Sequence, residues 1–77
     1  MTQADRLKER HEARDKVRAL VDAGVKCTLD GQPAVIRGFQ SDFGKVGEVN
    51  DHIREAEWSW PAILGVLTKH RGNFKTR

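Results

Sequence analysis

The stretch AEWSWPAILGVL, residues 56–67, contains both tryptophans of the chain, placed around one serine and directly before a proline. Ser59 is suited to begin a helix, because its hydroxyl can accept a hydrogen bond from a free N–H of the first turn. Pro61 then falls in that turn, where a missing N–H is tolerated. We therefore predict that a strand is followed directly by a helix here. We also predict that the two tryptophans pack in the core and at the corner between these elements and do not form a ligand-binding site.

The helix predicted to follow this corner has one apolar stripe, which consists of Trp60, Ile63, Leu64 and Leu67. It should end near Arg71, with Gly72 as the next residue. Basic side chains in its last turn would lie at the negative end of the helix dipole, where they stabilise the helix.

A longer helix is predicted before the strands, over residues 3–23. This segment lacks glycine and proline, and Gly24 follows it as a natural helix terminator. Its large apolar residues recur at helical spacing only in the second half, and before Ala13 the one large apolar residue is Leu7. Residues 1–12 are therefore expected to be a polar part of the helix that projects from the domain.

Between the helices the pattern changes to that of β-strands. Val25, Cys27 and Leu29 alternate with polar residues, and Asp30-Gly31 suits the positive φ angles of a tight hairpin turn. Pro33 cannot donate to a strand ladder, so its end of the second strand is expected at an edge or in a bulge. The second, third and fourth strands are predicted over residues 34–39, 43–49 and 52–58.

These elements predict one α+β domain over residues 1–77: an N-terminal helix, a four-stranded antiparallel meander that forms a small curved sheet, and a C-terminal helix. Residues 73–77 would then be a basic tail. The predicted core consists of Val17, Leu20, Val21, Val25, Cys27, Leu29, Val35 or Ile36, Phe39, Val46, Ile53, Trp58, Ile63, Leu64 and Leu67.

Composition restricts the class of protein. A chain of 77 residues with 38% hydrophobic and 32% charged residues forms a thin core. Cys27 is the single cysteine, so no intrachain disulfide can form, and the charged N-terminus does not resemble a secretory signal. No apolar run is long enough to span a membrane. We expect a cytoplasmic protein without a membrane partner.

Two groups of basic residues are candidates for binding a partner. In the first helix, Arg6, Arg10, Arg14 and Arg18 follow one another at intervals of four and lie along one stripe. Guanidinium groups in a row suit phosphates or the carboxylates of a partner. The alternative is an ordinary solvated face, because acidic residues are interleaved elsewhere in this helix.

The second group is the C-terminal stretch TKHRGNFKTR, residues 68–77, which carries no acid although the net charge of the whole chain is only +3. Basic residues around an aromatic ring can hold backbone phosphates and stack a base. Alternatively, the aromatic residue folds back onto the second helix. The candidate binding residues here are Lys69, His70, Arg71, Phe74, Lys75 and Arg77.

No catalytic or metal-binding set is recognisable in the sequence. His11, His52 and His70 are far apart and share no ligand spacing with Cys27. Glu55 and Glu57 would share one face of a strand, but neither has a nearby histidine. Gly38, Gly44 and Gly47 lie in strand patterns and open no helix that could hold a phosphate. We expect a protein that is not an enzyme and that needs no cofactor or metal.

The leading hypothesis is a small non-catalytic binding module that docks through basic surface on an anionic partner, either nucleic acid or a nucleoprotein complex. The alternative is a protein-binding inhibitor or adaptor, encoded by a phage or mobile element, that acts on a host protein complex. The layout is similar to small accessory proteins of mobile elements in architecture only, and no motif carries that similarity. A homodimer is compatible with either hypothesis.

Overall fold

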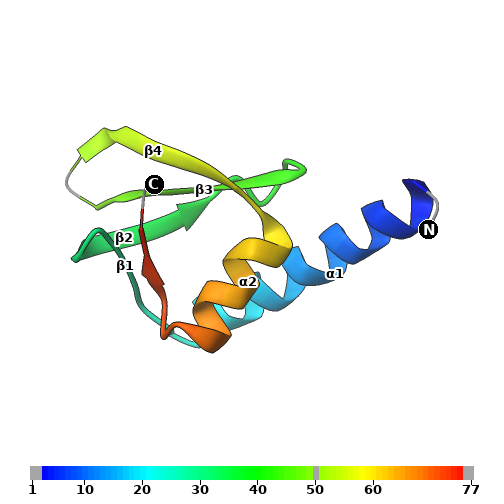
Figure 1. The fold of residues 1–77 in the computed structure, drawn as a ribbon, viewed down its shortest axis with the longest axis horizontal. Helices are drawn as coiled ribbons and strands as arrows, with labels where there is room; N and C mark the ends of the chain where they lie inside the picture. The colour runs from blue at the N-terminus through cyan, green and yellow to red at the C-terminus, as the bar shows by residue number, and fades with distance from the viewer. Residues whose placement is uncertain (1–2, 50, 76–77) are drawn as a thin grey trace.

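The computed structural model describes residues 3–49 and 51–75, and the side chains of residues 3–6 and 51–54 lie outside that description. Two helices and a five-stranded sheet make up the fold (Figure 1). In chain order the elements are α1 (Gln3–Asp22), β1 (Cys27–Leu29), β2 (Gln32–Arg37), β3 (Phe43–Glu48), β4 (Asp51–Ser59), α2 (Trp60–Lys69) and β5 (Asn73–Phe74).

The sheet confirms the α+β class but differs from the predicted topology. Its strand order is β4-β3-β2-β1-β5, and the four strands of the meander pair in antiparallel fashion. After α2 the chain returns as β5 and pairs in parallel with β1, so α2 is not the last element. The N–H groups of Thr28 and Asp30 donate to the carbonyls of Gly72 and Phe74 at 2.8 and 2.9 Å. The predicted basic tail therefore begins with a strand.

The sheet curls until its two outer strands approach each other. Trp58 of β4 and Phe74 of β5 make an edge-to-face contact with ring centroids 5.4 Å apart. Helix α2 lies against the inside of this curl, and α1 packs beside α2 (Figure 1). The N-terminal half of α1 extends away from the sheet (Figure 1).

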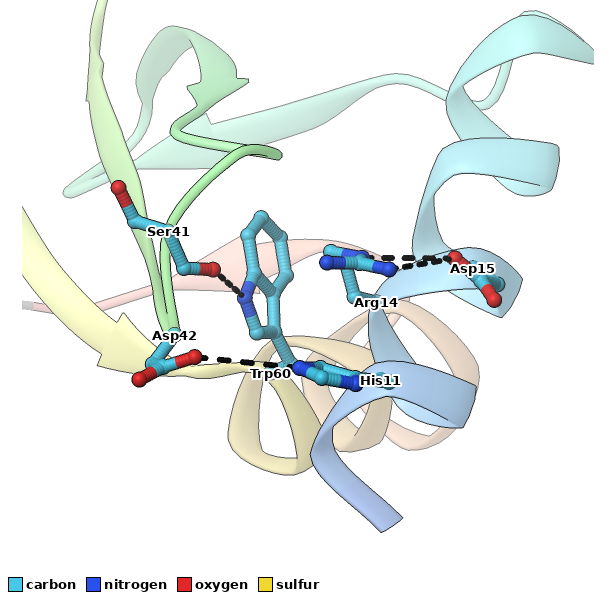
Figure 2. Close-up of polar contacts among 6 residues, drawn as sticks. All are labelled: His11, Arg14, Asp15, Ser41, Asp42 and Trp60. Atoms are coloured by element: carbon cyan, nitrogen blue, oxygen red, sulfur yellow. Dashed lines mark hydrogen bonds and ion pairs between the residues drawn. The ribbon is translucent and has the colours of Figure 1, made fainter. Parts of the chain in front are cut away.

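The corner between β4 and α2 is confirmed. Ser59 caps the helix by accepting a hydrogen bond from the N–H of Ala62 at 3.4 Å, and proline occupies the first turn. Trp60 is fully buried, and its indole N–H donates to the carbonyl of Ser41 at 2.9 Å (Figure 2). Gly44 of β3 makes room for this ring, because an added Cβ would lie 2.8 Å from it.

Local turn chemistry explains the remaining connections. Asp30 and Gly31 have φ angles of 51° and 85°, which confirms the predicted hairpin. The expectation that Pro33 would lie at a sheet edge or in a bulge is wrong, because β2 is an inner strand. The carbonyl of Pro33 accepts a hydrogen bond from the N–H of Val49, just beyond the last residue pair of the β2–β3 ladder. The N–H that Pro33 lacks would therefore fall where that ladder stops.

Half of the fourteen predicted core positions are buried, and the buried core also includes Ala13, Trp60 and Phe74, which the predicted core did not include. Of the other predicted positions, Val25 is 40% exposed. Leu20, Val21, Phe39, Trp58 and Leu64 are only partly buried, and the side chain of Ile53 lies outside the described residues. The buried apolar residues are Ala13, Val17, Cys27, Leu29, Ile36, Val46, Trp60, Ile63, Leu67 and Phe74.

Candidate functional site

A cleft of about 540 Å³ opens between the end of α2, β4 and β5. Its basic lining residues are Lys69, His70, Arg71 and Lys75, and we call this site the basic cleft. Trp58, Val66 and Asn73 complete the lining, so none of the described residues around it is acidic.

The turn after α2 brings these basic residues together. His70 is the C-cap residue of α2. Arg71 and Gly72, which follow it, both have positive φ, at 55° and 77°. The helix was predicted to end near Arg71, and it ends at Lys69 with His70 as its C-cap. The chain reverses direction here, which places Lys75 beside the same cleft as Lys69 of the helix.

The end of α2 does not itself attract anions, because helix C-termini carry negative partial charge. Part of this charge is neutralised within the turn: the carbonyl of Val66 accepts from the N–H groups of His70 and Gly72, both at 3.0 Å. Attraction of an anion to the basic cleft therefore depends on its side chains.

Trp58 forms the aromatic part of the cleft wall. Its indole Nε1 is buried and has no hydrogen-bond partner among the described residues. Trp58 as a residue is only partly buried. Because the nitrogen is hidden, the surface that Trp58 offers to the cleft is carbon, and Val66 adds to it.

Phe74 occupies a different position from the one that a base-stacking role requires. It is 1% exposed and packs into the core against Trp58. Its aromatic ring therefore anchors β5, and the prediction that it contacts a partner is corrected. The aromatic surface at this site belongs to Trp58, which sequence reasoning had assigned to the core.

The arginine stripe of α1 faces the turn between β2 and β3. The guanidinium of Arg10 lies 5.4 Å from the ring centroid of Phe43, and that of Arg18 lies 5.8 Å from the centroid of Phe39. The Phe39 ring in turn stacks on Trp60 at 5.1 Å. The stripe thus helps to fasten α1 to this turn.

The two other arginines of the stripe, Arg14 and Arg6, make no described contact with an aromatic ring. Arg14 has no carboxylate three or four residues away in the helix, but its guanidinium lies 3.4 Å from the carboxylate of the adjacent Asp15 (Figure 2). His11 and Asp42 form a longer pair at 3.9 Å between the helix and the turn (Figure 2). The side chain of Arg6 lies outside the described residues, as does all of Arg77.

The two basic groups do not form one surface. On α1, the arginines at intervals of four occupy one flank, while Glu9, Glu12 and Lys16 occupy the other and line a groove against α2. Lys69 lines both that groove and the basic cleft, whereas none of the stripe arginines whose side chains are described lines the basic cleft.

Sequence reasoning identified the basic residues of the cleft but missed its other walls. Asn73 is held in place by accepting a hydrogen bond from the hydroxyl of Thr28 at 2.9 Å. That contact exists because β5 pairs with β1, and a two-residue strand carries no periodic pattern that the sequence could show.

Other classes of site find little support in the described part of the chain. It contains no cluster of three or more His, Cys, Asp or Glu residues suited to a metal ion. Cys27 is buried, and burial raises the pKa of its thiol. Neither helix is both long and apolar enough to cross a bilayer, as judged over the described residues.

Comparison with known proteins gives no further indication. No family model matches the chain, and neither the curated proteins nor the solved structures include a significant match to it.

Proposed function

We propose that this protein is a non-catalytic binding module that holds nucleic acid, alone or within a nucleoprotein complex, through the basic cleft. The observation that carries this proposal is the gathering of four basic side chains around one cleft whose described lining has no acid. Such a cleft attracts a chain of phosphates, whose counterions are released when lysine and arginine neutralise them.

The arginine stripe supports the proposal less directly. The guanidinium groups of Arg10 and Arg18 lie over aromatic rings of the protein. A guanidinium in such a position keeps further N–H donors, and those can still contact a phosphate. We assign the stripe a secondary role in positioning a longer partner.

The test is a titration of the protein with a single-stranded oligonucleotide of about 12 nucleotides at several salt concentrations. Affinity should fall steeply between about 50 and 200 mM salt, and the slope counts the phosphates that are neutralised. Absence of binding at low salt, or binding that salt leaves unchanged, would contradict the proposal.

A second candidate function is an inhibitor or adaptor that binds a host protein. It is favoured by the projecting half of α1, where Leu7 is 41% exposed, and by the start of β3, where Phe43 is 39% exposed. Under this hypothesis Leu7→Asp abolishes capture of a protein from nuclease-treated lysate, while Lys75→Gln has no effect. Under the leading proposal nuclease removes everything that the protein captures.

A further inference from the structure

The chemistry of the basic cleft has two parts, and together they narrow the ligand. Lys69, Arg71 and Lys75 supply positive charge, whereas Trp58 and Val66 supply apolar surface. A phosphate alone would use only the first part. A ligand that carries both an anion and a flat apolar ring would use both.

We infer that the basic cleft takes one unpaired nucleotide, with the base against Trp58 and the phosphate between the basic side chains. This inference depends on the proposed function and extends it, because it makes the preferred partner a single strand.

The position of Trp58 favours a base over other apolar groups. Its Nε1 is buried and the residue lines the cleft, so the side chain offers carbon atoms there and no donor. Bases stack on such aromatic surfaces without regard to their hydrogen-bonding groups. Because no donor or acceptor of the indole is offered to the ligand, this contact should show little preference among the bases.

A double helix cannot make both kinds of contact in the basic cleft. Its bases are stacked and paired inside, and only its phosphates and groove edges reach a protein surface. A duplex could contact Lys69, Arg71 and Lys75 but could not place a base against Trp58. Single-stranded nucleic acid can present a splayed base and its phosphate to the two parts of the cleft at once.

The experiment compares three ligands with the full chain: oligo(dT), an abasic oligonucleotide with the same number of phosphates, and a duplex of the same length. We expect the abasic strand to bind about fivefold or more weakly than oligo(dT), which corresponds to the removal of one stacked base. The duplex should bind with an affinity close to that of the abasic strand.

Nuclear magnetic resonance of the unaltered protein locates the contact without a destabilising substitution. The two tryptophans give two indole N–H resonances. Oligo(dT) should shift that of Trp58, whereas that of Trp60, whose N–H is bonded to Ser41 in the core, should stay in place.

The outcomes separate this inference from the proposed function. Equal binding of oligo(dT) and the abasic strand, with an unmoved Trp58 resonance, would overturn the stacked base and leave phosphate binding intact. Failure of all three ligands to bind at low salt would overturn both. Equally tight binding of a poly-glutamate peptide would show that the cleft recognises negative charge alone, and would also overturn both.

Discussion

Gly72 determines how closely the chain can cross itself after α2. It has a φ of 77°, and a Cβ added there would lie 2.7 Å from the carbonyl oxygen of Lys26. Its own carbonyl accepts the hydrogen bond from Thr28 that starts the β1–β5 pairing. A side chain at this position would therefore disturb both the turn that shapes the basic cleft and the strand that follows it.

Substitution of Gly72 tests this close approach. We expect Gly72→Ala to lower the free energy of unfolding by about 1–3 kcal/mol, through a strained φ and a clash with backbone that cannot move aside. Gly65→Ala is the matched control, because an added Cβ there meets nothing within 4 Å. Because residue 65 lies in the middle of a helix, Gly65→Ala should raise the free energy of unfolding by about 0.5–1 kcal/mol. Equal effects of the two variants in urea unfolding would contradict this account.

Cys27 is the buried titratable group whose behaviour can be predicted. It is 9% exposed, and burial raises the pKa of its thiol because a thiolate there would be poorly hydrated. The native thiol should therefore react with a disulfide reagent far more slowly than the thiol of the urea-unfolded chain. Equal rates would show that the β1 region opens freely.

The same shift predicts how stability depends on pH. Between the ordinary thiol pKa of about 8.5 and the raised one, the folded chain keeps a proton that the unfolded chain releases. The contribution of Cys27 is complete below that window and disappears as pH rises through it. Cys27→Ala should therefore flatten the decline of stability in urea titrations above about pH 8.5.

At the scale of elements, α1 divides into a packed half and a projecting half. Ala13 and Val17 are buried, whereas Leu7 is 41% exposed. Helix stability in proteins comes mainly from the packed face, so the second half should hold the helix in place. The first half contributes the stacking of Arg10 on Phe43 and the long pair between His11 and Asp42.

Removal of residues 1–11 tests this division. The shortened chain should be only about 1 kcal/mol less stable, because an exposed cation–π interaction contributes about 0.5–1 kcal/mol. Thermal unfolding measures this directly. A much larger decrease would mean that the projecting half is packed, for example against a second copy of the chain, which would make the copy a structural partner.

Local pattern explains which elements were predictable from the sequence. The β4–α2 corner and the β1–β2 turn follow from neighbouring residues: Ser59 with Pro61, and Asp30 with Gly31. The parallel return of β5 depends instead on a pairing of Thr28 with Asn73, far apart in the chain. For the same reason the role of Phe74 was misassigned, because its burial is a consequence of that pairing.

At the scale of the whole molecule, the curled sheet and two helices separate the basic residues into two places. The cleft joins the end of β4, α2 and β5, which follow one another in the chain, but no local pattern indicated that the turn after α2 brings Lys75 back beside Trp58. The arginine stripe was predictable from its spacing, but its packing on Phe39 and Phe43 was not. The fold therefore shifts the expected binding surface from the stripe toward the cleft.

A comparison of two charge-neutralised variants tests that claim most directly. Lys69→Gln with Lys75→Gln removes two charges from the basic cleft, and Arg10→Gln with Arg14→Gln removes two from the stripe. The measurement is the affinity for oligo(dT) as a function of salt. We predict that the cleft variant binds more weakly and that its salt slope falls by about 1.4, or 0.7 for each phosphate that is no longer neutralised, while the affinity and the slope of the stripe variant fall less. A lowered slope in the stripe variant, with an unaltered cleft variant, would contradict the account and place the binding surface on α1.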